Sequence, residues 1–171
     1  MLTAMTALRL YTDGSCPTPG AAGGWAWIAV RGDAETRASG PIPAPSNHQK
    51  AELTAAIEGL AYVLESGVRE VELLSDSKHV VEGMSSYGDT GWAHAAAKRE
   101  WRTTRGKPFK NPDLWERLLE LEGCLAVSYR HVPGHRPKKD TSDDAHYNHE
   151  VDVLAVQARK RLGFVVPGAL P

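Results

Sequence analysis

The sequence predicts an α/β fold in which helices pack on a mixed sheet. Three short segments near the N-terminus alternate apolar with polar or small residues, the pattern of β-strands, and two further strand-like runs follow. Between and after them lie segments whose apolar residues recur every three or four positions, the period of helices. The 171 residues suit one compact domain with a sizeable core. We expect that domain to cover residues 1–163, followed by a C-terminal tail at 164–171.

The first three strands are expected at residues 8–13, 23–32 and 35–42, with a tight turn at Gly32-Asp33 between the last two. The first strand ends in Asp13, which a glycine follows. An aspartate in that place either shapes a turn or holds a ligand at the end of the strand. The stretch alone leaves both interpretations open.

The first helix is predicted over residues 46–67. A capping box of Ser46 and Gln49 would start it, and Gly67 would end it. A fourth strand is expected at residues 69–76, where apolar residues return to a strand-like run.

A second helix at 77–84 leads into the segment 85–110, which is polar and basic and in which we expect at least one helix. A further helix at 111–123 opens with Asn-Pro, a pair typical of a cap and a first turn. The fifth strand is expected at 124–134. A last helix at 148–163 would have its first residue, an asparagine, as its cap and its last, a glycine, as its stop. The charged stretch 136–147 lacks periodicity and is predicted to be a loop.

The composition is that of an ordinary globular protein, with 42% apolar residues, 24% charged residues and a formal net charge of -1. The two cysteines, Cys16 and Cys124, are too few for a disulfide framework or a thiolate metal site. The sequence shows no signal peptide and no run of the roughly 20 apolar residues that a membrane helix needs. We therefore expect a cytoplasmic protein without a membrane partner, and a monomer.

Positive charge is concentrated in the segment 85–110, although the whole chain is almost neutral. Its basic residues are Lys98, Arg99, Arg102, Arg105, Lys107 and Lys110, and Trp92 and Trp101 lie among or beside them. A basic run by itself is most often a solvated helix face. The tryptophans favour a phosphate-binding surface instead, because phosphate contacts come chiefly from lysine and arginine.

Three further acids occupy positions comparable to that of Asp13. Asp76 ends the fourth strand, and Glu52 and Asp152 lie in the first turns of two helices. Each has an ordinary structural explanation, as a cap, a partner of the helix dipole or the edge of an amphipathic stripe. Gathered at one end of the sheet, however, the acids would repel one another, and a divalent cation would relieve that repulsion. Two such ions about 3.5–4 Å apart can hold an attacking water and a leaving oxygen in line across a phosphodiester.

Six blocks of the sequence, in order and over nearly the whole chain, resemble type 1 ribonuclease H. They are YTDGSC…GGWAW, HQKAELTAAIEGL, LLSDSKHVVEGM, KNPDLWERL, HVPGH and NHEVDVLA. The resemblance implies a ribonuclease H-like α/β fold, a mixed five-stranded sheet with helices packed on both faces. It also implies an enzyme that hydrolyses the RNA strand of RNA–DNA hybrids with two Mg²⁺ or Mn²⁺ ions, leaving a 5′-phosphate and a 3′-hydroxyl.

The resemblance assigns a role to each candidate catalytic residue. Asp13 would bridge both ions. Glu52 and Asp76 would hold the ion near the nucleophilic water, and Asp152 would hold the other. His135 matches the loop histidine of the family, which assists proton transfer or product release. Histidine titrates near neutrality and is chemically suited to that role.

The resemblance also implies a set of substrate-binding residues. The turn after Asp13 and the residues before the helix glutamate would read the RNA minor groove, and the segment 85–110 would act as the handle that grips DNA phosphates. These residues are Ser15, Cys16, Asn47, His48, Gln49, Lys78, Trp92, Lys98, Arg99, Trp101 and Arg102. The sequence departs from the family's pattern at His48, Lys78 and Ala96, where asparagine, glutamine and an aromatic residue are common.

A non-catalytic module that binds hybrids or duplexes is the alternative function, since the basic segment and these departures would suit a binder. A binder that had lost catalysis would be expected to lack at least one carboxylate, and all four are present. A nuclease of the same fold with another substrate, such as a DNA junction, is a third interpretation. The DGSC turn and the handle-like segment disfavour it.

Overall fold

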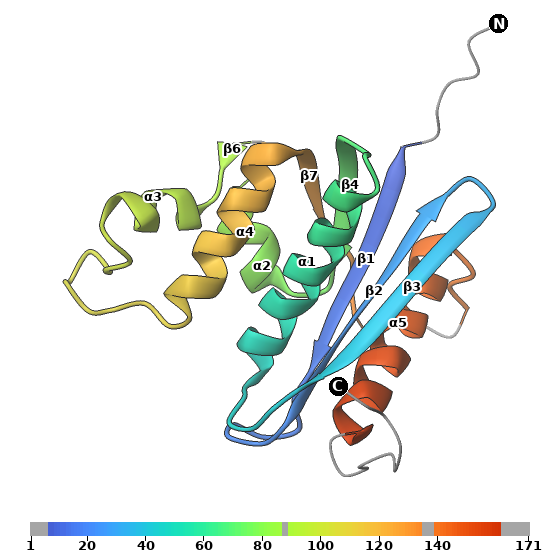
Figure 1. Cartoon of the computed structure of the whole chain (residues 1–171), viewed down its shortest axis with the longest axis horizontal. Coiled ribbons are helices and arrows are strands. Elements are labelled where there is room, and N and C mark those ends of the chain that lie inside the picture. The colour runs from blue at the N-terminus through green and yellow to red at the C-terminus, as the bar shows by residue number, and fades with distance from the viewer. Residues whose placement is uncertain (1–6, 87–88, 135–138, 162–171) are drawn as a thin grey trace, which may run out of the picture.

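The central element of the computed structural model, which describes residues 7–86, 89–134 and 139–161, is a five-stranded sheet (Figure 1). Its strand order is β3-β2-β1-β4-β7. The strands are β1 (Leu8–Ser15), β2 (Gly23–Arg31), β3 (Ala34–Ile42), β4 (Glu70–Ser75) and β7 (Ala126–His131). β1, β2 and β3 pair antiparallel, whereas β4 pairs parallel with β1 and β7 parallel with β4. The predicted mixed five-stranded sheet is confirmed.

Helices cover both faces of the sheet. On one face α1 (His48–Glu65) packs on β1 and β2 and α4 (Pro112–Cys124) packs beside α1, while α5 (Asp143–Lys160) crosses β1, β2 and β3 on the other face (Figure 1). Successive side chains of a strand point to opposite faces, so Leu10 belongs to the apolar cluster under α1 and Tyr11 to the smaller cluster under α5. The predicted two-sided arrangement is therefore confirmed.

The chain between α2 (Lys78–Met84) and α4 forms a smaller unit on the α1 side. It contains the short hairpin of β5 (Ser85–Ser86) and β6 (Asp89–Thr90), followed by α3 (Trp92–Lys98). Figure 1 shows α3 projecting beyond the edge of the sheet. α3 confirms the helix expected in the segment 85–110, which we call the handle segment. The hairpin was not predicted, because strands of two residues are too short to show an alternating pattern.

The start of α1 differs from the prediction in its capping residue. The cap is Asn47, whose side chain accepts a hydrogen bond from the amide of Lys50 at 2.9 Å. The predicted cap, Ser46, is buried, and its amide donates to the carbonyl of Ala21 instead. Asparagine caps helices as well as serine does, so the helix simply begins later. The predicted end is confirmed, since Gly67 has a φ of 80°.

The start of α5 is a larger correction. The helix begins at Asp143, so the loop predicted at 136–147 is wrong over its last five residues, and Asn148 lies inside the helix rather than capping it. The cap is Ser142, whose hydroxyl accepts a hydrogen bond from the amide of Ala145. The prediction failed because this first turn is polar and has no apolar period. Its acidic residues nevertheless suit a helix N-terminus.

The remaining predicted helix features have mixed outcomes. α4 starts at the predicted Asn111-Pro112 pair, but Asn111 is left-handed with a φ of 54° and its side chain makes no capping hydrogen bond. Gly163, the predicted stop of α5, lies outside the described residues.

Cys16 and Cys124 are both free. Within residues 7–86, 89–134 and 139–161, no helix has the length and apolar character needed to cross a membrane.

Candidate metal centre and nucleic-acid surface

Three of the predicted acids meet at the carboxyl end of β1. Asp13 lies on β1, Asp76 directly follows β4, and Glu52 lies on α1. Because β1 and β4 are parallel neighbours, their carboxyl ends lie side by side. One oxygen from each of the three carboxylates lies within 4.8 Å of the other two. We call these three residues the acid cluster.

Glycine at position 14 allows α1 to approach β1 closely. A Cβ atom at Gly14 would overlap the backbone of Ala51 and Glu52. The helix backbone therefore fills the space that a side chain would need, and this brings Glu52 against the strand that carries Asp13. The amide of Gly14 also donates a hydrogen bond of 2.9 Å to the Asp13 carboxylate.

The fourth acid, Asp152, approaches the cluster from α5. Its side chain is exposed, and its negative charge raises the pKa of both Asp13 and Asp76. Asn148 precedes it by one helical turn and is buried, and its side chain lowers the pKa of Asp76. Sequence reasoning missed this role of Asn148. The signal was its spacing of four residues from Asp152, which places both on one side of the helix.

The environment of the acid cluster opposes full ionisation. Burial raises the pKa of Asp13 to about 8, with the charge of Asp76 as the second cause. Burial and neighbouring acids also raise the pKa values of Glu52 and Asp76. Both carboxylate oxygens of Glu52 are buried and accept no hydrogen bond from any described residue. Largely buried carboxylates that repel one another fit a hard divalent cation, which supplies the missing positive charge.

Comparison with known proteins agrees with this chemistry. The family model described as RNase H matches residues 5–160. The ribonuclease H of Erythrobacter litoralis is 37% identical over 154 residues, which are 90% of this chain and 96% of that protein. The chain belongs to the ribonuclease H family. This membership confirms the resemblance and places the chain among nucleases, as predicted.

Solved structures of the ribonuclease H family have the same fold. RNase H1 from the halophilic archaeon Halobacterium salinarum superposes with a TM-score of 0.61 at 24% identity, covering 90% of this chain and 98% of that one. LC11-RNase H1, solved in complex with RNA/DNA hybrid, gives a TM-score of 0.65 at 15% identity, with 92% of this chain and 99% of that one covered.

Two histidines border the cluster through contacts that were not predicted. The Nε2 atom of His48 lies 3.3 Å from Oε1 of Glu52, without the alignment of a hydrogen bond. The ring of His131, at the end of β7, lies with Nε2 3.2 Å from the backbone carbonyl oxygen of Asp76. His135, the predicted proton-transfer residue, lies outside the described residues. The preceding Gly134 passes so close that a Cβ there would lie 2.5 Å from Oδ2 of Asp76.

The predicted substrate-binding residues outside the handle segment lie close to the acids along the chain. Ser15 ends β1 and Cys16 follows it, while Asn47, His48 and Gln49 form the start of α1. His48 and Gln49 are exposed, as is Lys78 at the start of α2. The Cys16 thiol is engaged locally, with its sulfur 3.2 Å from the carbonyl oxygen of Thr18. The structure therefore brings these positions to the rim of the cluster, and their contacts with substrate stay predictions.

The handle segment contains exposed basic residues and packed aromatic rings. Lys98, Arg99 and Arg102 are exposed. Trp92 stacks on Phe109 with 5.6 Å between ring centroids. Trp101 is only 7% exposed, and its indole N–H donates to Glu116 at 2.7 Å. Trp101 thus has little surface left for the predicted contact with substrate, because its ring packs between the handle segment and α4. Ala96, at the position of the missing aromatic, is fully buried.

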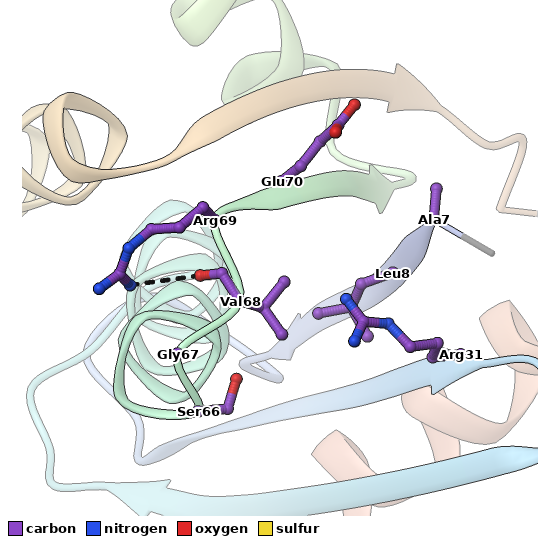
Figure 2. Close-up of a pocket in the computed structure, with 8 residues that line it drawn as sticks. All are labelled: Ala7, Leu8, Arg31, Ser66, Gly67, Val68, Arg69 and Glu70. Carbon is purple, nitrogen blue, oxygen red and sulfur yellow. Dashed lines mark hydrogen bonds between the residues drawn. The ribbon is translucent and has the colours of Figure 1, made fainter. Parts of the chain in front are cut away.

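A cavity of about 530 Å³ lies away from this site (Figure 2). It is formed by the start of β1, the turn after α1 and the start of β4, and Arg31 and Val68 point into it. None of the predicted site residues lines it. Asp13 lies five residues beyond Leu8 on β1, roughly 16 Å away at the rise of a strand. The acid cluster, and not this cavity, is the centre of the expected chemistry.

Proposed function

We propose that the protein hydrolyses the RNA strand of RNA–DNA hybrids, using two divalent metal ions and leaving 5′-phosphate and 3′-hydroxyl ends. The observation that carries the proposal is the acid cluster, in which one oxygen of each carboxylate lies within 4.8 Å of the others and the oxygens of buried Glu52 accept no hydrogen bond from a described residue. Membership of the ribonuclease H family supports hybrids as the substrate. So does the solved complex of LC11-RNase H1 with RNA/DNA hybrid.

Each acid has a place in the proposed metal centre. Asp13 would contact both ions, Glu52 and Asp76 would hold the first, and Asp152 would hold the second. Bound Mg²⁺ or Mn²⁺ lowers the pKa of water and stabilises charge on a phosphate. The chain itself helps to orient Asp13, because the Gly14 amide donates a hydrogen bond to its carboxylate, and the side chain of Asn148 favours the ionised form of Asp76.

Selectivity for a hybrid requires a test for the 2′-hydroxyl on one strand. We propose that Ser15, Cys16, His48 and Gln49 contact the RNA strand beside the acid cluster. DNA phosphates would be contacted by Asn47 and Lys78 at the rim of the acid cluster. The exposed lysine and arginines of the handle segment would contact them as well. In this proposal the RNA strand would lie over the acids and the DNA strand toward α3.

Several further features belong to the same proposal. His135 would assist proton transfer or product release. The single domain would extend over residues 1–163 and act as a monomer in the cytoplasm, with Mg²⁺ as the usual ion. The domain would include the handle segment and the stretch 136–147. The tail 164–171 would follow it.

A substrate panel tests the proposed function. Purified protein with Mg²⁺ is given an end-labelled RNA–DNA hybrid, single-stranded RNA, RNA duplex and DNA duplex in parallel. We expect cleavage of RNA in the hybrid alone, with products that carry a 5′-phosphate. Hybrid that is bound but never cut, in Mg²⁺ or in Mn²⁺, would instead favour a non-catalytic binding module.

A further inference from the structure

The first turn of α5 is fastened to three strands by side chains outside the acid cluster. The Tyr11 hydroxyl on β1 donates to Oδ1 of Asp144 at 2.7 Å. Arg130 on β7 donates to Oδ2 of the same aspartate at 2.6 Å. Arg130 also donates to Glu72 on β4 at 2.9 Å. Asp144 therefore ties the helix start directly to β1 and β7 and, through Arg130, to β4.

The central acceptor of this network, Asp144, is half-buried, whereas Arg130 is exposed. The Asp144 side chain is only 17% exposed. Burial by itself would raise the pKa of Asp144, but hydrogen bonds from Arg130 and Tyr11 outweigh burial and lower it. Asp144 therefore stays ionised at neutral pH, where charge-assisted hydrogen bonds are roughly twice as strong as neutral ones. Tyr147 adds a second contact, since its ring stacks on Tyr11 with 5.0 Å between centroids.

The network shares its strand and its helix with the metal centre. Tyr11 precedes Asp13 by two residues on β1, so both side chains lie on the α5 face of the sheet. On α5, the residues Asp144, Asn148 and Asp152 follow at intervals of four and lie along one side of the helix. The first of them accepts a hydrogen bond from Tyr11, and the side chain of the second lowers the pKa of Asp76. The charge of the third acts on Asp13.

Asp152 depends on this alignment more than the other acids do. Asp13 and Glu52 are buried and Asp76 is half-buried, whereas Asp152 is exposed. Packing around its own side chain therefore does little to fix its position. A slide of α5 along β1 by one residue would move Asp152 by about 1.5 Å, enough to disturb a metal ligand.

We propose that Tyr11, Asp144 and Arg130 are positioning residues that fix the register of α5 against β1 and so hold Asp152 at the metal centre. The inference rests on the proposed function, because it takes Asp152 as a ligand of the second ion. The three residues are not among the four acids that would bind the metal ions. They act by positioning Asp152 and are not catalytic residues.

The experiment compares three variants of the full chain. Tyr11→Phe removes one hydroxyl and keeps the ring that stacks on Tyr147. Asp144→Ala removes both acceptor oxygens, and Asp144→Asn keeps one. Glu120→Gln is the matched control, since it removes a carboxylate from the exposed Arg117–Glu120 pair on α4. Mg²⁺ binding is measured by calorimetry, the dependence of hybrid cleavage on Mg²⁺ by steady-state kinetics, and stability by thermal unfolding without metal.

We expect Asp144→Ala and Tyr11→Phe to weaken Mg²⁺ binding about three- to tenfold, less than the loss typical of a direct neighbour of a ligand. The Mg²⁺ concentration for half-maximal cleavage should rise by the same factor. At saturating Mg²⁺, KM for hybrid and kcat should stay within about twofold of the parent, because the ligands themselves are unchanged. Asp144→Asn should recover part of the loss, and Glu120→Gln should match the parent.

The outcomes separate this inference from the proposed function. A lower unfolding temperature with unchanged Mg²⁺ binding in Tyr11→Phe and in Asp144→Ala would mean a purely structural role and would overturn the positioning inference alone. If the parent protein neither binds Mg²⁺ nor cuts hybrid, the proposed function fails and takes the inference with it.

Discussion

Asp13 is a carboxyl group buried among other acids, and its protonation links stability to pH. Its pKa rises from an ordinary 3.8 to about 8 in the metal-free fold. The folded state therefore holds this proton more tightly than the unfolded state does. The stabilisation that the proton gives is complete below pH 3.8 and is lost as the pH rises toward 8.

We expect Asp13→Asn to stabilise the metal-free protein at neutral to alkaline pH, because the substitution removes a buried charge that other acids repel. The gain in the free energy of unfolding should be on the order of 1–3 kcal/mol at about pH 8 and should shrink as the pH falls toward the ordinary pKa. Thermal unfolding of both proteins in EDTA across this range measures it. Equal midpoints at alkaline pH would contradict the raised pKa of Asp13.

Gly14 provides a second residue-scale prediction. A Cβ there would overlap the backbone of Ala51 and Glu52, so Gly14→Ala must push α1 away from β1 and separate Glu52 from Asp13. We expect a loss of at least about 2 kcal/mol in the free energy of unfolding and weaker Mg²⁺ binding. Chemical denaturation and calorimetry would measure the two effects.

Gly123 is the matched control for that substitution, because a Cβ at Gly123 has no neighbour within 4 Å and the residue lies within α4. Gly123→Ala should leave Mg²⁺ binding unchanged and raise stability by up to about 1 kcal/mol. An equally mild effect of Gly14→Ala would refute the close approach of α1 and β1.

Individual residues show which parts of the site could be predicted from the sequence. The acids Asp13, Glu52 and Asp76 were named from the family's motifs, and the structure brings them together. The roles of Asn148 and of His48 beside Glu52 were not predicted. The spacing of Asn148 from Asp152 places both on one side of α5, but which strand that side of a helix faces depends on parts of the chain distant in sequence.

At the scale of elements, apolar periodicity located α1 and α4 but not the first turn of α5. The stripe of α1 packs on the sheet, so its sequence shows the helical period. The first turn of α5 is instead held by Tyr11 and Arg130 through Asp144, and a turn held by polar contacts has no apolar period. The start of a helix can therefore be set by partners distant in sequence.

The handle segment gives a prediction at the same scale. Lys98 is the last residue of α3, is exposed, and makes no hydrogen bond or ion pair with any residue that the structure describes. If it contacts a DNA phosphate, Lys98→Gln should weaken hybrid binding about three- to tenfold and reduce the dependence of log K on log salt by about one. Binding titrations in EDTA at several salt concentrations measure both quantities.

Arg69→Gln is the charge-matched control, because Arg69 is exposed in the turn after α1 and lines the cavity at the far end of the sheet. It should leave the affinity and the salt dependence as they are in the parent. Equal effects of the two substitutions would mean that net charge, rather than the handle segment, attracts the nucleic acid.

At the scale of the whole molecule, the topology creates the site. β1 and β4 lie parallel and adjacent, so their carboxyl ends bring Asp13 and Asp76 to one edge of the sheet. α1 and α5 then deliver Glu52 and Asp152 from opposite faces. Periodicity along the chain predicted the five strands but not their order, because pairing between strands distant in sequence leaves little local trace. The sequence was therefore compatible with acids that meet at one site, but only the fold shows that they do.

The most direct test of the central claim is cleavage of a labelled RNA–DNA hybrid by the parent protein and by Asp13→Asn, each with Mg²⁺ and with EDTA. We expect RNA fragments only for the parent with Mg²⁺, while both proteins still bind the hybrid. Equal cleavage by Asp13→Asn, or cleavage by the parent in EDTA, would contradict a metal centre built on Asp13.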